Sequence, residues 1–301
     1  MSNLILLAVS FVIGIVLRQS GRIPQQAPAT LNSFIIHVSL PALTLLYLHD
    51  LKMTGDVVLV AAMAWICFGL SAGFFWLLGR WLALPRATVG ALILTGGLGN
   101  TSFFGLPMIE AYYGHEGLVS GIIADQLGSF LVLSTLGITV AGVYSSGRPG
   151  MAEIGRRIVT FPPFIALVLA LLLIPVEYAP WFTTLLKRLG DTLAPLALVS
   201  VGLQLRLGHL VGNLRNLAIG LGFKLLLVPL VIYLLYVPLL GGQGQAIRVT
   251  VFEAAMPPMI TAAIIASEHD LDPELSTLMV AVGLLLSFVT LTAWWWLLRG
   301  V

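Results

Sequence analysis

Residues 96–107 read GGLGNTSFFGLP and stand inside an otherwise apolar segment that runs from about Val89 to Tyr112. That segment is long enough to cross a bilayer, since a helix rises about 1.5 Å per residue. Pro107 has no N–H and crowds the carbonyl group four residues before it, so we expect the helix to open near Phe103. Opened backbone is tolerated at membrane depth only where it is buried in protein or lines a wet cavity. The stretch therefore predicts either an interrupted helix that forms a binding site, as in many secondary transporters, or a packed proline kink.

The composition of the whole chain favours an all-α integral membrane protein. The chain has 301 residues, of which 58% are hydrophobic and only 9% are charged, whereas soluble domains carry roughly 25% charged residues. This leaves almost no room for a soluble domain. The net charge of +2 comes without any run of basic residues, so nucleic acid is not an expected partner.

Hydropathy divides the chain into ten expected membrane spans. They are residues 3–17, 31–48, 57–78, 89–112, 118–144, 158–176, 185–205, 216–240, 247–267 and 275–298. The longest connection, 145–157, separates a first five-helix repeat, residues 1–144, from a second, residues 158–301.

Basic residues in the connections predict the orientation of these spans, because cytoplasmic loops carry an excess of Lys and Arg. The connections after spans one, three, five and seven hold Arg18, Arg22, Arg80, Arg86, Arg148, Arg156, Arg157, Arg206 and Arg215. The opposite side holds Lys52, Lys187, Arg188, Arg248 and Arg299. We therefore expect connection 145–157 in the cytoplasm and both termini outside, in the cytoplasmic (inner) membrane of a bacterium.

Prolines at corresponding places in the two halves favour an inverted repeat. Pro41 in span two corresponds to Pro195 in span seven, and Pro107 in span four corresponds to the pair Pro257 and Pro258 in span nine. Because each half has five spans, an odd number, the second half enters the membrane in the opposite sense. Helices four and nine are then expected to be broken at their prolines and to cross near the midplane. A coincidence of prolines is the alternative.

Polar side chains inside the spans are candidate binding groups, because an ionisable group in hydrocarbon costs about 2.5 kcal/mol or more unless it has a partner. Glu253 lies one turn before the break in span nine, so its carboxylate could join carbonyl groups freed by the prolines to bind a small cation or a proton. Asp125, Gln126 and Ser129 offer a second such group in span five. Alternatively, Lys224 in span eight neutralises one of the carboxylates in a structural ion pair.

Four motifs resemble those of the auxin efflux carrier family. They are GNTSFFGLP at 99–107, PLALVSVGL at 195–203, the run from EAAMPPM at 253–259 to SEHDLDPEL at 267–275, and LSFVTL at 286–291. The resemblance covers the whole chain and, as in the related bile-acid/sodium symporters and plant PIN auxin carriers, implies two inverted five-helix repeats crossed at helices four and nine. It further implies a scaffold of helices one, two, six and seven and a moving transport domain of helices three, four, five, eight, nine and ten.

The resemblance also implies a class of substrate and a coupling ion. Family substrates are organic anions, either dicarboxylates such as malate and malonate or the weak acid auxin, and the short central connection is unlike that of the plant auxin carriers. By similarity to the sodium symporters, ion-coordinating groups are expected at Asn100, Thr101, Asp125, Ser129, Glu253 and Met256. The coupling ion is then sodium or a proton.

These features predict a secondary transporter that moves a small organic anion by elevator-type alternating access, with no enzymatic activity and no cofactor. We expect the substrate at Asn100, Thr101, Ser102, Pro107, Pro257 and Pro258. We expect the coupling ion at Asp125, Gln126, Ser129, Glu253 and Met256, and a sodium ion, if one binds, at Asn100, Thr101, Asp125, Ser129 and Glu253.

The expected partners are the organic anion and the lipid bilayer, with a second copy of the chain in a homodimer. One alternative is a receptor or sensor that binds a small anion without moving it, although a receptor is expected to carry a signalling domain. A second alternative is an intramembrane enzyme that uses Asp125 and Glu253 as a catalytic pair, although no known protease motif surrounds either residue.

Overall fold

The computed structural model describes residues 2–24, 26–48, 55–145, 156, 159–204 and 214–301. Within these ranges all the regular secondary structure is helical, apart from one isolated β-bridge between Gly99 and Pro258. Most of the expected connection 145–157 lies outside the described residues, as do four basic residues that set the expected orientation, Lys52, Arg148, Arg157 and Arg206.

The chain forms two compact units, each assembled from segments far apart in the sequence. The first unit consists of residues 1–54, 102–122 and 155–205, and the second of residues 55–101, 123–154 and 206–301. The division into repeats 1–144 and 158–301, and the division into scaffold and transport helices, stay predictions.

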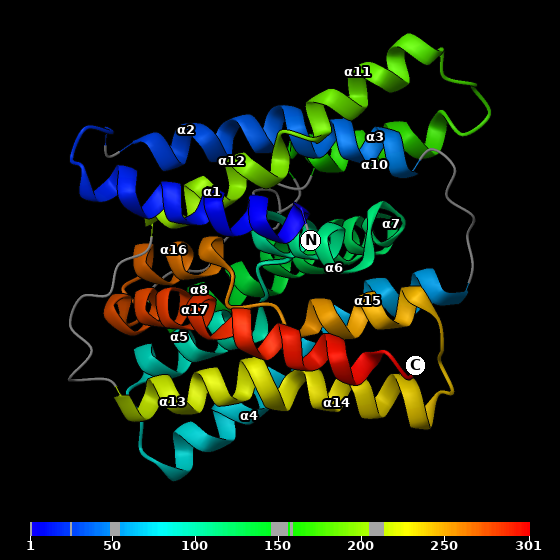
Figure 1. The fold of residues 1–301 in the computed structure, drawn as a ribbon. Helices are drawn as coiled ribbons and strands as arrows, with labels where there is room; N and C mark the ends of the chain where they lie inside the picture. The colour runs from blue at the N-terminus through cyan, green and yellow to red at the C-terminus, as the bar shows by residue number, and fades with distance from the viewer. Residues whose placement is uncertain (1, 25, 49–54, 146–155, 157–158, 205–213) are drawn as a thin grey trace. The chain divides into compact units, whose positions relative to one another are not determined.

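The first unit contains helices from both halves of the sequence. They are α1 (Ser2–Gln19), α2 (Ala27–Phe34), the π-helical segment η1 (Ile35–Ser39), α3 (Leu40–Leu48), the π-helical segment η2 (Thr101–Gly105), α6 (Leu106–Tyr113), α7 (His115–Ile123), α10 (Pro162–Leu172), α11 (Pro180–Gly190) and α12 (Leu193–Gln204). The first residue of η2, Thr101, and the last residue of α7, Ile123, belong to the second unit. Helix α1 runs beside α12, and α3 packs against α10 and α11 (Figure 1).

Glycines allow α1 and α12 to approach so closely that their backbones touch. A Cβ atom on Gly14 would collide with the carbonyl oxygen of Val199, and one on Gly202 would collide with that of Phe11. Small residues that let two backbones meet are typical of helix pairs in membranes.

The second unit is centred on α5. Its helices are α4 (Gly55–Trp81), α5 (Arg86–Gly97), η3 (Ala124–Phe130), η4 (Leu133–Gly137), α8 (Ile138–Tyr144), α13 (Leu214–Gly222), η6 (Phe223–Leu227), α14 (Val228–Leu234), η7 (Leu235–Leu239), α15 (Gln245–Ala254), α16 (Ile260–Glu268) and α17 (Pro273–Leu298). Helix α5 packs against α4, α8, α16 and α17.

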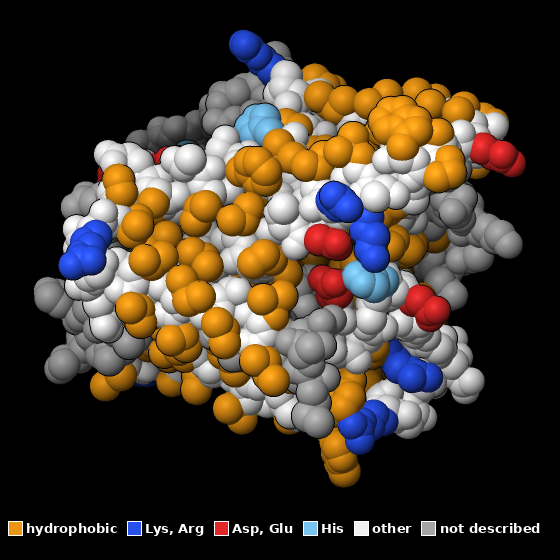
Figure 2. All heavy atoms as spheres, turned by 45° about the horizontal axis from the view of Figure 1, so that its top comes forward, with side chains coloured by type: hydrophobic (Ala, Val, Ile, Leu, Met, Phe, Trp, Pro, Cys, Tyr) orange, Lys and Arg blue, Asp and Glu red, His pale blue; other side chains and the backbone are white. Residues whose placement is uncertain are grey.

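Five described helical stretches are long and apolar enough to cross a membrane. They are Ala27–Leu48, Val57–Trp81, His115–Tyr144, Leu214–Leu239 and Pro273–Leu298. Val9–Gln19 and Pro162–Leu172 are shorter apolar helices. Figure 2 shows a face on which hydrophobic side chains are widespread, while most of its charged side chains gather on the right of the view. The total of ten spans and their inverted relation stay predictions.

The break in the expected span 89–112 differs in place from the prediction. The helix was expected to open near Phe103, but α5 ends at Gly97 and Phe103 lies within η2. Pro107 is the second residue of α6, which directly follows η2, and the start of a helix tolerates a missing N–H. The opening falls on residues 98–100, directly after Gly96 and Gly97 and including Gly99, because glycine is a poor helix former.

The expected span 185–205 also differs from the prediction, because it consists of two helices. Helix α11 ends at Gly190 and α12 begins at Leu193. Pro195 therefore lies in the first turn of α12 and does not itself interrupt a helix. Pro41 is likewise the second residue of α3, and α3 directly follows η1.

Candidate functional site

The breaks that follow α5 and α15 lie against each other and are joined through backbone atoms. Beyond α5 the chain is extended, with Leu98 at φ −115° and ψ 122°. The N–H of Asn100 donates to the carbonyl of Pro257 at 2.8 Å, and the N–H of Met259 donates to the carbonyl of Leu98 at 2.9 Å. These two bonds form one antiparallel bridge, so the interrupted segments of spans four and nine meet inside the second unit.

Two prolines explain why α15 ends at this bridge. In a continuous helix, the carbonyls of Glu253 and Ala254 would accept hydrogen bonds from residues 257 and 258, which are both proline and have no N–H. The carbonyl of Glu253 accepts instead from the N–H of Met256 at 3.1 Å. The carbonyl of Ala254 accepts from the ammonium group of Lys224 at 2.9 Å.

Lys224 therefore brings the terminal nitrogen of a basic side chain to the bridge. It lies on η6, its side chain is 1% exposed, and its Nζ lies 3.2 Å from the position that a Cβ atom on Gly99 would take. The same Cβ atom would lie 3.4 Å from Cβ of Met256. Glycine at position 99 thus leaves the room that the ammonium group occupies.

Two side chains beside the bridge are buried with polar atoms that lack hydrogen-bond partners in the part of the chain that the structure describes. Asn100 is 1% exposed and Glu253 is 0% exposed, and none of the four side-chain nitrogen and oxygen atoms is bonded. A buried polar group left unpaired costs about 1–3 kcal/mol, and more when charged. Such groups in a native structure need an explanation, and a bound solute or ion would provide one.

The predicted group in span five lies on the π-helical segment η3. The hydroxyl of Thr101 donates to Oδ1 of Asp125 at 2.7 Å, and Asp125, Gln126 and Ser129 are all buried. Asp125 repels the carboxylate of Glu253 electrostatically, whereas Lys224 attracts it. Short π-helical turns inside α-helices occur frequently at functional sites.

Most of the predicted site residues therefore lie in the second unit, around one bridge. Ser102 on η2 and Pro107 on α6 belong to the first unit. A direct ion pair between Lys224 and Glu253 is not formed, because both carboxylate oxygens of Glu253 lack a partner among the described residues. Sequence reasoning considered Lys224 only as such a partner and did not predict its bond to the Ala254 carbonyl.

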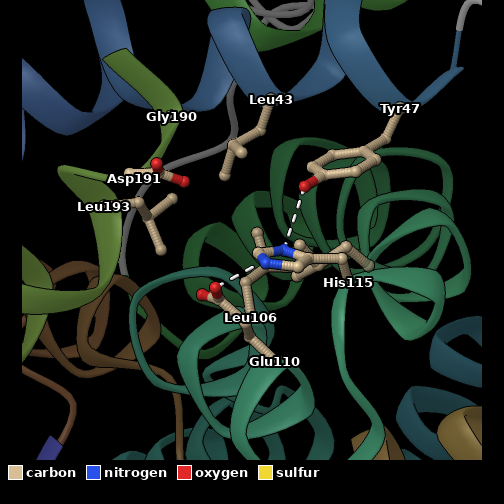
Figure 3. A pocket seen from close by; sticks show the side chains of 9 residues that line it. Leu43, Tyr47, Leu106, Glu110, His115, Gly190, Asp191 and Leu193 are labelled. Carbon is tan, nitrogen blue, oxygen red and sulfur yellow. Dashed lines mark hydrogen bonds and ion pairs between the residues drawn. The ribbon is translucent and has the colours of Figure 1, made fainter. Parts of the chain in front are cut away.

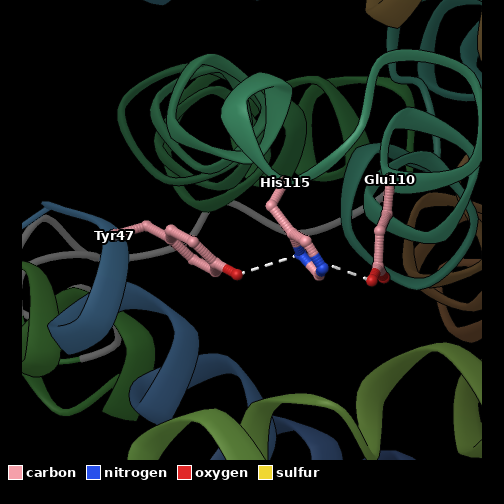
Figure 4. A network of polar contacts seen from close by, with 3 residues as sticks. All are labelled: Tyr47, Glu110 and His115. Atoms are coloured by element: carbon pink, nitrogen blue, oxygen red, sulfur yellow. Dashed lines mark hydrogen bonds and ion pairs between the residues drawn. The ribbon is translucent and has the colours of Figure 1, made fainter. Parts of the chain in front are cut away.

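Sequence reasoning missed a pocket within the first unit. It is lined by Leu43, Tyr47, Leu106, Glu110, His115, Leu118, Gly190, Asp191 and Leu193 (Figure 3). The hydroxyl of Tyr47 lies 3.0 Å from Nδ1 of His115, and an imidazole nitrogen of His115 lies 3.5 Å from Oε1 of Glu110 (Figure 4). No local sequence motif indicates this network, since Tyr47 and His115 are 68 positions apart.

This arrangement defines a class of protein, an all-helical chain with several apolar helices in which two interrupted helices are joined at their breaks. The chain matches the family model for membrane transport proteins over residues 1–295. The chain therefore belongs to this membrane transport family, the auxin efflux carriers, and is a multi-pass membrane protein.

Two relatives extend over almost the whole chain. An uncharacterized transporter of Methanothermobacter thermautotrophicus is 32% identical, with 94% of this chain and 93% of the relative covered. An uncharacterized transporter of Methanocaldococcus jannaschii is 24% identical, with 99% of this chain and 98% of the relative covered. Both relatives are archaeal, so the bacterial membrane expected from the sequence stays a prediction.

Proposed function

We propose that this chain is a secondary active transporter that carries a small organic anion across the cytoplasmic membrane by elevator-type alternating access. The observation that carries the proposal is the buried side-chain amide of Asn100, which has no hydrogen-bond partner among the described residues although it lies next to the bridge between two interrupted helices. An amide can donate two hydrogen bonds to a carboxylate. A solute that enters and leaves would satisfy it for part of the transport cycle.

The start of α16 supplies further donors for the same anion. Its first N–H groups have no acceptor within the helix, and the positive end of the helix dipole attracts negative charge. Helix α16 begins at Ile260, two residues after Pro258 of the bridge. Of the substrate groups expected from the sequence, Asn100, Thr101, Pro257 and Pro258 lie within two residues of the bridged pair in the second unit, whereas Ser102 and Pro107 belong to the first unit.

A carboxylate substrate fits these donors best. Dicarboxylates such as malate and malonate, or an auxin-like weak acid, are the proposed substrates. The coupling ion, a proton or sodium, would be held by Asp125, Gln126, Ser129, Glu253 and Met256, all of which are buried.

The proposal also covers the orientation in the membrane, the scaffold and the oligomeric state. Both termini lie on the outer side of the membrane. The first, second, sixth and seventh expected spans, residues 3–17, 31–48, 158–176 and 185–205, act as a scaffold. Two copies of the chain form a homodimer. No cofactor takes part.

Replacement of Asn100 tests the assignment. Asn100→Ala should reduce the counterflow of labelled malonate into proteoliposomes by at least about tenfold, because at least one charge-assisted hydrogen bond of about 1.5–3 kcal/mol is lost. Asn216→Ala is the matched control, since Asn216 is partly exposed on α13. Counterflow in Asn100→Ala equal to that of the wild type would remove Asn100 from the substrate site.

A further inference from the structure

The end of α15 is bonded to the side chain of a buried lysine. Pro257 and Pro258 remove the donors that would bond the last carbonyls of α15, and the ammonium of Lys224 bonds the carbonyl of Ala254 at 2.9 Å. The ammonium is buried and lies against Gly99, at the bridge itself. A cation is favoured there, because the carboxyl end of a helix carries partial negative charge.

The charged and titratable groups that face this position come from four elements. Glu253 on α15 attracts Lys224 on η6, and Asp125 on η3 repels Glu253. The thiol of Cys67 on α4 also lies near enough to Lys224 to interact with it electrostatically. Of these groups, Glu253 has two buried oxygens that have no partner among the described residues.

A sodium ion fits these surroundings poorly. A hard metal ion needs several oxygen ligands around it, and the backbone carbonyl that the broken helix releases at Ala254 is already bonded to an ammonium group. A second cation at the same place would be repelled by the first. In the described part of the chain, no three side chains of His, Cys, Asp or Glu are grouped so as to hold a metal ion.

We propose that Lys224 is an internal cation that stands in the place of sodium at the bridge, and that the coupling ion is a proton bound by Glu253. This inference rests on the proposed function and decides between its two coupling ions. In the empty site the ammonium of Lys224 offsets the carboxylate of Glu253. An arriving organic anion competes for the ammonium and is repelled by that carboxylate.

A proton removes this repulsion. It forms an O–H bond with one carboxylate oxygen of Glu253, so that one proton enters with the anion, and the O–H bond breaks to release the proton to water on the other side. No covalent bond of the substrate changes. Because the ammonium is part of the protein, the positive charge that draws the anion to the bridge is not released together with the anion.

The role of Lys224 is tested by sodium binding to the purified full-length chain. The melting temperature is measured in detergent, with sodium chloride or choline chloride at equal ionic strength. A ligand that binds only the folded protein raises its melting temperature. We expect no sodium-specific rise for the wild type and for Lys224→Arg, and a rise of a few degrees for Lys224→Gln, in which the position is vacated.

Lys187→Gln removes an exposed positive charge from α11 and should behave like the wild type. A sodium-specific rise in the wild type would overturn the inference. So would a Lys224→Gln variant that folds, as shown by its elution as a single species, and is still indifferent to sodium.

The role of Glu253 is tested by proton movement in proteoliposomes that contain a pH-sensitive dye. Uptake of labelled malonate by the wild type should acidify the lumen, and an acidic outside should raise the uptake severalfold, whereas a sodium gradient should not. Glu253→Gln should lower proton-driven uptake by a larger factor than it lowers counterflow. Glu274→Gln, an exposed change on α17, is the matched control.

The two kinds of failure can be told apart. Malonate uptake that a sodium gradient drives, with no proton entry, would overturn the inference while leaving the proposed function intact. A wild type without counterflow of any labelled mono- or dicarboxylate would refute the proposed function. The sodium measurement would still show whether Lys224 occupies the position that a sodium ion would otherwise take.

Discussion

The hydrogen bond between Thr101 and Asp125 gives a quantitative test of how the second unit is held together. Thr101→Val replaces the hydroxyl by a methyl group of nearly the same size, so the shape of the residue is kept while Asp125 loses a donor at 2.7 Å. Hydrogen bonds to charged groups contribute about 1.5–3 kcal/mol. Since about 1.4 kcal/mol corresponds to a factor of ten, the population of open conformations should rise about tenfold to a hundredfold.

Cys67 provides the assay for this change. It is the one cysteine in the sequence, and it is buried on α4, which packs against η3. The rate at which a thiol-reactive fluorophore labels it measures the open population, provided that closing is fast compared with labelling. Thr101→Val should be labelled about tenfold to a hundredfold faster than the wild type.

Thr101→Ser is the matched control, because it keeps the hydroxyl and loses one methyl group. That loss costs about 0.8 kcal/mol, so labelling should rise only about fourfold. A valine variant labelled no faster than the serine variant would refute the reasoning. A double-mutant cycle with Asp125→Asn adds a second check, since a coupling energy near zero would show that the two side chains do not stabilise each other.

Three further predictions concern packing and capping. Gly283→Ala would place a Cβ atom 2.7 Å from the ring of Pro258, so it should destabilise the protein by about 1–3 kcal/mol and lower the melting temperature; an unchanged midpoint would contradict the geometry of the bridge. Gly202→Ala would force α12 away from the backbone of Phe11 and should cost a similar amount, measured as loss of helical circular dichroism on heating. Asp272→Ala removes the side chain that caps α17 and should cost about 1 kcal/mol, whereas Asp272→Asn should retain most of the cap when the two are compared by thermal unfolding.

The positions of the helices could be predicted because hydropathy is a local property of the chain. The expected spans 57–78 and 275–298 correspond to α4 (Gly55–Trp81) and α17 (Pro273–Leu298) within a few residues. The point of interruption was harder to predict, because Pro107 can open a helix before itself or begin the next one, and its own residue type does not decide between them. The helix ends at Gly97, so the glycines at 96, 97 and 99 mark the point of interruption.

The candidate site was predictable as a set of residue types but not as a set of partners. Asn100, Thr101, Asp125 and Glu253 stand out because polar groups in apolar spans need a reason to be there. The acceptor of Lys224 is a carbonyl 30 positions away, and backbone carbonyls look alike in any sequence. The pocket around His115 escaped notice for a similar reason, since its residues come from distant stretches that only the fold brings together.

The bridge after α5 and α15 has a consequence for how such a chain can diverge. Its two hydrogen bonds use only main-chain atoms, at Leu98, Asn100, Pro257 and Met259, so exchanging a side chain removes neither donor nor acceptor unless proline replaces Asn100 or Met259. Neighbouring side chains that have room can then be exchanged one at a time without the loss of either hydrogen bond. Single side-chain replacements around the bridge are therefore a route by which related transporters change their substrate while both main-chain hydrogen bonds are kept.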